Sequence, residues 1–157
     1  MALEIERKFL VKGDFKPFST EKKKIVQGYL SLDPGRSIRV RIVDNEAFLT
    51  IKGISGEDGL SRFEWETAIN PDDARNLIRL HDGYLVEKYR FIVPEDTGLR
   101  FEVDEFIGDN SGLVIAELEI PDKNYPFVKP ACLGNEITGN DKYYNVYLAV
   151  NPFKNWK

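Results

Sequence analysis

The sequence contains only one cysteine, one histidine and one methionine among its 157 residues. The single cysteine, Cys132, excludes an internal disulfide, and the single histidine, His81, excludes the Cys/His spacing of a zinc site. No run approaches the roughly 18 consecutive apolar residues of a membrane-spanning helix, and the first residues lack the apolar region of a signal peptide. We therefore expect a cytoplasmic protein in which Cys132 and His81 are structural or surface residues.

A glycine-rich phosphate-binding loop, internal repeats and low-complexity tracts are also missing. The formal net charge of −4 argues against a general nucleic-acid or membrane-surface role, because those partners usually require a net basic patch. With 42% hydrophobic residues, the chain is long enough to bury a real core. We expect one domain over residues 1–157, with no nucleic-acid or membrane partner.

Charged and apolar residues alternate with a period of two. In an extended strand Glu4, Glu6 and Lys8 share one face, whereas Leu3 and Phe9 share the other. The same alternation recurs at 38–42, 49–52, 62–66, 88–91, 101–104 and 116–120. A merely solvated sheet face would mix serine, threonine, glutamine and lysine, but here acids cluster on some strands and bases on others. This clustering indicates a functional surface.

Eight stretches read as strands separated by short turns. They cover residues 3–11, 25–32, 37–43, 47–54, 60–69, 84–93, 99–106 and 113–120. Asn70 is a predicted N-cap, with Pro71 at the first position of a helix that runs to about Leu80, and a final helix is expected over 140–149. The sequence therefore predicts an α+β fold that is mainly β: an eight-stranded antiparallel β-barrel with a few covering helices.

The direction of the charged face decides what such a barrel could do. If the apolar face points inward, the charges coat the outside and the sequence does not reveal a function. If the charged face points inward, the barrel is a polar tunnel whose outer apolar face needs cover from helices and loops. Clustering by sign favours the tunnel, because a mixed-sign interior is costly unless a charged ligand and a metal ion complete it.

The tunnel would combine basic and acidic side chains in one cavity. The bases are Lys8, Arg39, Arg41, Lys52, Arg62, Lys88 and Arg90. The acids are Glu4, Glu6, Glu64, Glu66, Glu102, Asp104, Glu117 and Glu119. Arginine binds phosphate oxygens with a fork of donors, and carboxylates are the ligands that Mg²⁺ or Mn²⁺ prefers. The combination indicates metal-dependent phosphoryl transfer on a polyanionic substrate.

The N-terminal segment Glu4-Ile5-Glu6-Arg7-Lys8 resembles the ExExK signature of the CYTH superfamily, also called triphosphate tunnel metalloenzymes. Later elements follow in that family's order: Arg39-x-Arg41, Lys52, Glu64-x-Glu66, Lys88-x-Arg90, Asp104 and Glu117-x-Glu119. Residues 136–145 resemble the C-terminal element of short bacterial members. The resemblance spans nearly the whole chain and implies an eight-stranded tunnel that hydrolyses a triphosphate.

The resemblance also implies roles for individual residues. Metal ligands would be Glu4, Glu6, Glu117 and Glu119, with Glu64, Glu66 and Asp104 as further ligands or a surrounding layer. Phosphate contacts would come from Lys8, Arg39, Arg41, Lys52, Arg62 and Arg90. Tyr29 and Lys88 would handle the proton, and Lys142 would close one mouth of the tunnel.

The implied reaction is hydrolysis of inorganic tripolyphosphate to pyrophosphate and phosphate with Mg²⁺ or Mn²⁺, by a monomer or homodimer. Related alternatives are a nucleoside or thiamine triphosphatase and an adenylate cyclase of the class IV type. An alternative of another class is a non-catalytic polyphosphate-binding module. The Glu4/Glu6 and Glu117/Glu119 pairs favour an enzyme.

Overall fold

One nine-stranded antiparallel sheet forms the frame of the protein in a computed structural model, which describes residues 5–55 and 62–156. Its strands are β1 (Glu6–Val11), β2 (Glu21–Ser31), β3 (Arg36–Val43), β4 (Glu46–Ser55), β5 (Arg62–Ile69), β6 (Asp82–Pro94), β7 (Arg100–Ile107), β8 (Val114–Glu119) and β9 (Leu133–Glu136). The mainly β fold class is the predicted one.

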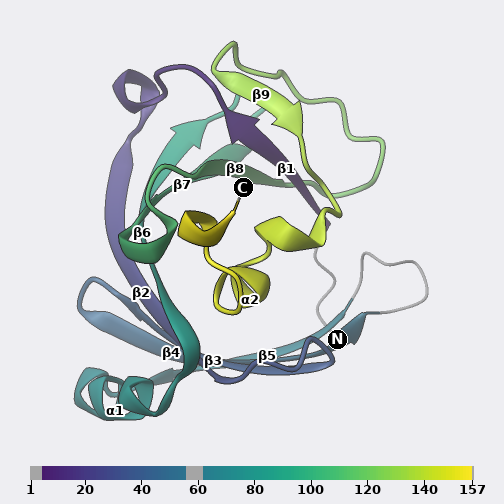
Figure 1. Cartoon of the computed structure of the whole chain (residues 1–157). Helices are drawn as coiled ribbons and strands as arrows, with labels where there is room; N and C mark the ends of the chain where they lie inside the picture. Colours follow the sequence, from purple (N-terminus) through teal and green to yellow (C-terminus); the bar gives the residue numbers. More distant parts are fainter. Residues whose placement is uncertain (1–4, 56–61, 157) are drawn as a thin grey trace.

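The strands follow the order β5-β4-β3-β2-β6-β7-β8-β1-β9. The sheet curves strongly, and the C-terminal segment lies inside the curve (Figure 1). The predicted antiparallel tunnel fold is confirmed, with nine strands in place of the eight expected; within the described residues no ladder joins β5 to β9, so the sheet is open at this edge. The ninth strand was missed because β9 is only four residues long, lacks charge alternation and is held at the sheet edge by backbone pairing with β1.

The strand register places opposite charges across from one another on the inner face. Lys8 lies opposite Glu117, Arg90 opposite Asp104, and Lys52 opposite Glu64. Because side chains alternate between the two faces, this register puts these charges on one common face of the sheet, and the lining of the cavity shows that this is the inner face.

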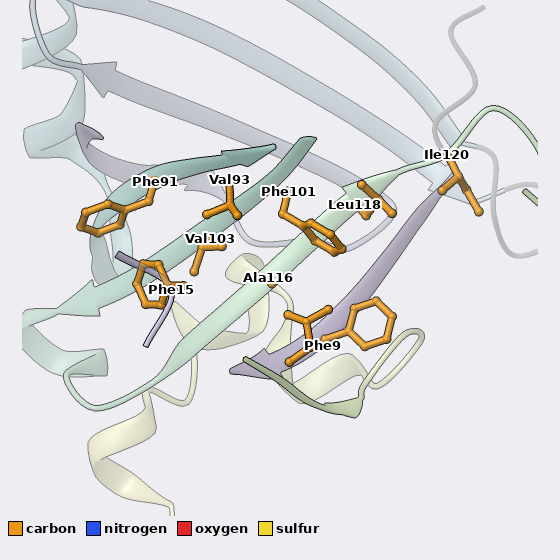
Figure 2. Packing of buried hydrophobic residues seen from close by; sticks show 10 residues of the cluster. Phe9, Phe15, Phe91, Val93, Phe101, Val103, Ala116, Leu118 and Ile120 are labelled. Atoms are coloured by element: carbon orange, nitrogen blue, oxygen red, sulfur yellow. The ribbon is translucent and has the colours of Figure 1, made fainter. Parts of the chain in front are cut away.

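The apolar face points outward and is covered. Figure 2 shows aromatic and aliphatic side chains from neighbouring strands packed on one side of the sheet, among them Phe9, Phe91 and Phe101. Tyr125 and Phe127, from the long connection between β8 and β9, pack against this cluster. The predicted requirement for cover by loops is therefore met over β6, β7, β8 and β1.

Helix α1 (Pro71–Leu77) covers the outer face of β3 and β4, where buried Ala74 meets Val40 and Ala47. Its predicted start is confirmed, because the Asn70 side chain accepts a hydrogen bond from the backbone N–H of Asp72. The helix continues as a 3₁₀ turn, Ile78–Leu80, that rests on β2. At Gly28 a Cβ would lie 2.9 Å from Ile78, so this close packing requires glycine.

The C-terminal segment contains the 3₁₀ turn Asp141–Tyr143 and helix α2 (Asn145–Leu148), followed by a 3₁₀ turn at Phe153–Asn155. The predicted helix over 140–149 is thus wrong in length, because Tyr144 has extended backbone angles (φ −70°, ψ 142°) that separate the two short turns. No described helix is long and apolar enough to cross a membrane.

Candidate functional site

A polar cavity of about 430 Å³ lies against the inner face of the sheet. Six cationic side chains line it: Lys8, Arg39, Arg41, Lys52, Lys88 and Arg90. Five carboxylates also line it: Glu6, Glu64, Glu66, Glu102 and Glu117. Residues that lie more than a hundred positions apart in the sequence therefore share one enclosed space, as the tunnel interpretation predicted.

Four of the cations, on β3 and β6, form a positively charged cluster: Arg39, Arg41, Lys88 and Arg90. Burial lowers the pKa of Arg41, and the positive charges of Arg39 and Arg90 lower it further. Burial lowers the pKa of Lys88 to about 7, since the positive charges of Arg90 and Arg41 offset much of the opposing effect of Asp104. A guanidinium stays protonated at neutral pH, so this cluster favours a bound anion.

Arg39 is fixed by its neighbours on β4 and β5. One terminal nitrogen donates a hydrogen bond to the Thr50 hydroxyl at 3.2 Å and lies 3.8 Å from Glu66. The Thr50 hydroxyl in turn donates to Glu66 at 2.6 Å. The Nε–H of Arg39 is buried and has no partner within the described part of the chain. A buried donor without an acceptor costs free energy, which an oxygen-rich ligand would recover.

Asp104 is almost fully buried and binds two cations at once. Its carboxylate accepts two hydrogen bonds from Arg90, at 2.8 and 3.0 Å, and lies 2.8 Å from the Lys88 ammonium. Burial alone would lower the pKa of Arg90. The negative charge of Asp104 and its hydrogen bonds have the larger effect and raise this pKa. Because both oxygens are engaged, Asp104 orients bases in this arrangement.

Glu6 and Glu117 form a hydrogen-bonded carboxylate pair between β1 and β8. Burial raises the pKa of Glu117, but Lys8, this hydrogen bond and Arg90 together bring it well below its ordinary value. The Lys8 ammonium lies 3.7 Å from Glu117 and 4.4 Å from the centre of the Tyr144 ring. In the ranges 5–55 and 62–156, no three carboxylate, imidazole or thiol groups are close enough together to hold a metal ion.

The remaining predicted residues are distributed as follows. Tyr29 lines the cavity and lies opposite Arg39 in the sheet register. Lys52 lies 3.9 Å from Glu64. Glu119 is exposed and is paired in register with Glu6, but it does not line the cavity. Lys142 lies outside the cavity, 4.5 Å from the centre of the Trp156 ring.

Two predicted residues cannot be placed in the site. Glu4 lies outside the described residues, and for Arg62 only the backbone, at the start of β5, is described. Their roles stay predictions from the sequence.

The prediction of site residues missed uncharged polar groups that surround the cavity. These are Gln27, Ser37, Thr50, Thr138, Tyr144 and Asn145. Gln27 and Thr50 carried a usable signal, because the period of two places them on the same strand faces as Tyr29 and Lys52. The C-terminal residues carried no periodic signal, and the resemblance of residues 136–145 to the family's C-terminal element was the indication that could have found them.

An antiparallel sheet curved around paired acids and bases, with a cationic cluster inside, defines a polyanion-binding tunnel fold. The CYTH domain family matches residues 2–142, and the chain belongs to this family.

Relatives cover the whole chain. An inorganic triphosphatase from Acetivibrio thermocellus is 42% identical over 158 residues, covering 100% of this chain and 99% of its own. One from Nitrosomonas europaea is 36% identical over 152 residues, covering 94% and 97%. The crystal structure of an inorganic triphosphatase has a TM-score of 0.72 at 31% identity, covering 96% of both chains.

Proposed function

We propose that this protein is an inorganic triphosphatase that hydrolyses tripolyphosphate to pyrophosphate and phosphate. The single observation that carries the proposal is the cationic cluster of Arg39, Arg41, Lys88 and Arg90 inside a cavity of about 430 Å³. The cavity has room for a short polyanion beside this cluster. Full-length relatives also bear the name inorganic triphosphatase.

The phosphate oxygens are bound by side chains in this proposal. Lys8, Arg39, Arg41, Lys52 and Arg90 line the cavity and supply donors, and Arg62 is added to this set from the sequence alone. The buried Nε–H of Arg39 gains an acceptor when substrate binds. Positive groups that are already fixed in the cavity stabilise the charge that grows during phosphoryl transfer without reorganising.

Tyr29 and Lys88 handle the proton of the attacking water. The water oxygen bonds to a terminal phosphorus and gives one proton to the Tyr29–Lys88 pair. The bond from that phosphorus to the bridging oxygen breaks, and pyrophosphate leaves with its electron pair. Both side chains line the cavity, and the lowered pKa of Lys88, about 7, suits proton exchange near neutral pH.

We propose that the acidic side of the cavity binds a divalent metal ion, Mg²⁺ or Mn²⁺, for which the described lining supplies Glu6 and Glu117 and the sequence alone adds Glu4. Glu6 and Glu117 are hydrogen-bonded to each other, and two carboxylates in contact are stabilised by a shared cation. We assign Glu4, Glu6, Glu117 and Glu119 as ligands, and Glu64 and Glu66 as further ligands. Such an ion would supply charge neutralisation at the phosphate oxygens. Asp104 instead holds Lys88 and Arg90 in position.

The test measures phosphate release from tripolyphosphate, ATP and thiamine triphosphate, with Mg²⁺, Mn²⁺ or a chelator, and analyses the ATP sample for cyclic AMP. We expect metal-dependent release that is fastest from tripolyphosphate. Preference for an organic triphosphate, or formation of cyclic AMP, would move the assignment to a sister activity. Tight binding of tripolyphosphate without turnover would support a binding module instead.

The small-molecule triphosphate is the partner that the proposal requires. A cytoplasmic location, a monomeric or homodimeric state, and the lack of nucleic-acid or membrane partners stay predictions from the sequence.

A further inference from the structure

The C-terminal segment forms part of the cavity wall as well as part of the core. Leu148 and Ala149 are fully buried and pack with Val86, Phe106 and Ile115 on the inner face of the sheet. Asn145, at the start of α2, lines the cavity. The buried end of the helix therefore fixes the position from which the Asn145 side chain reaches the sheet.

The Asn145 side-chain oxygen accepts two hydrogen bonds from different strands. One comes from the Lys88 ammonium on β6 and the other from the side-chain N–H of Gln27 on β2, both at 2.8 Å. The oxygen of Gln27, which is itself fully buried, accepts a hydrogen bond of 3.0 Å from Nε of Arg41. Asn145 is thus connected to two cations of the cluster, directly to Lys88 and through Gln27 to Arg41.

The chemistry of the groups allows only one orientation for this relay. Arg41 can only donate hydrogen bonds, so the Gln27 oxygen must face Arg41 and its N–H must face Asn145. The Lys88 ammonium likewise only donates. The Asn145 oxygen must then accept hydrogen bonds from both the Gln27 side-chain N–H and the Lys88 ammonium. A neutral amide satisfies them without placing another negative charge beside a polyanion site.

The relay has a consequence for how Arg41 meets a ligand. A guanidinium is a planar fork of five donors, and a bond at Nε fixes the rotation of the plane. Burial lowers the pKa of Arg41, and the positive charges of Arg39 and Arg90 lower it further, so Arg41 lies beside cations that repel it. The acceptor at Nε holds Arg41 in place against this repulsion.

We infer that Asn145 is a positioning residue of the hydrolytic site, which fixes the direction in which Arg41 and Lys88 present their remaining donors to the triphosphate. The inference rests on the proposed function. It assigns to the C-terminal segment a role in turnover that is separate from its role in packing.

The test compares Asn145→Ala with Asn145→Asp in steady-state hydrolysis of tripolyphosphate by the full chain. Alanine removes the shared acceptor, and we expect kcat to fall by about tenfold or more. Aspartate keeps an acceptor for both donors but adds charge, so kcat stays within about threefold while KM rises several-fold. Asn151→Ala is the matched control, since Asn151 is exposed on the same segment. We expect its kcat and KM to equal those of the wild type.

A double variant of Gln27 and Asn145 distinguishes a positioning role of Asn145 from a packing role. The double variant Gln27→Ala with Asn145→Ala should lose about as much kcat as the more damaging single variant, because the two amides act as one unit. Thermal unfolding and circular dichroism would show that each variant is folded. Equal kcat for wild type and Asn145→Ala would overturn the inference. It would also be overturned if Asn145→Ala and Asn145→Asp lost the same factor in kcat and this loss matched their loss of thermal stability.

The outcome also distinguishes this inference from the proposed function. If the wild type itself releases no phosphate from tripolyphosphate, the proposed function fails, and calorimetric titration with tripolyphosphate then decides the inference. Weaker binding by Asn145→Ala, by about fivefold or more, would support positioning. Unchanged binding, or a wild type that does not bind tripolyphosphate at all, would overturn it.

Discussion

The Lys88 ammonium lies 2.8 Å from the Asp104 carboxylate, and each of the two side chains is only 1% exposed. The same carboxylate binds Arg90 through two hydrogen bonds. Removing one member of a buried ion pair leaves an uncompensated charge, which costs far more than the pair itself contributes. Asp104 is therefore a position where a small chemical change has a large expected effect on stability.

We predict that Asp104→Asn lowers the free energy of unfolding by about 3–5 kcal/mol, because Lys88 loses its buried counter-charge and Arg90 keeps only its ion pair with the more exposed Glu102. Urea denaturation measures the difference. Glu105→Gln is the matched control on the same strand, since Glu105 is partly exposed and pairs with Lys16 at the surface, and we expect a change below about 1 kcal/mol. Similar values for the two variants would contradict the described environment of Asp104.

Arg39→Ala should raise KM and lower kcat for tripolyphosphate, with a loss in kcat/KM of about a hundredfold. The reason is that a phosphate contact made by a preorganised guanidinium acts in both the bound and the transition state. Arg36→Ala, on the same strand but with a side chain 77% exposed, is the control and should retain wild-type kinetics. Wild-type kinetics for Arg39→Ala would remove Arg39 from the substrate site.

Glu117→Gln should abolish metal-dependent turnover while the protein remains folded, since it removes one charge from the Glu6–Glu117 pair. Calorimetric titration with Mn²⁺ should show binding that is at least tenfold weaker than in the wild type. Glu46→Gln, an exposed residue at the start of β4, provides the comparison. Unchanged Mn²⁺ affinity in Glu117→Gln would refute the assignment of Glu117 as a ligand.

The environment of Glu95 predicts how the stability of the fold depends on pH. Its buried carboxylate accepts hydrogen bonds from the backbone N–H groups of Thr97, Leu99 and Val128 and from the Thr97 hydroxyl. Burial raises the pKa of Glu95, but these bonds outweigh it and bring the pKa below the ordinary value of 4.5. The folded state thus binds the proton more weakly than the unfolded state, so Glu95 stabilises the fold above about pH 4.5 and loses this contribution as the pH falls through its lowered pKa.

Glu95→Gln should therefore be less stable than the wild type by about 1–3 kcal/mol near neutral pH, and the gap should narrow below about pH 4. Denaturant unfolding at a series of pH values measures it. Glu21→Gln, at an exposed position of β2, should show no such gap at any pH. A gap for Glu95→Gln that stays constant down to about pH 3 would contradict the expected linkage.

Much of the fold could be predicted because its strands obey a strict period of two. That pattern correctly placed Lys8, Arg39 and Glu117 on one inner face, even though they come from distant parts of the chain. The start of α1 was also predictable, since Asn70 and Pro71 form a cap whose chemistry is local.

What the sequence could not indicate depends on tertiary contacts. Strand β9 is specified by pairing with β1 and has no periodic signal of its own. The amide of Asn145 acquires its importance only when α2 is inserted beside Gln27 and Lys88. Asp104 was predicted within the site, but only its two ion pairs reveal that it orients bases.

Strand β1 lies between β8 and β9, and this placement limits how early during synthesis the protein can form its cavity. Arg7 binds Glu136 across 129 positions of sequence, and Lys8 meets Glu117 in the same region. Contacts with such long separations form late, because the intervening chain must be available before they can stabilise anything. During synthesis β1 therefore has no partner until β8 and β9, in the last third of the sequence, have been made. Shorter chains contain many charged residues of the cavity but cannot form the cavity itself.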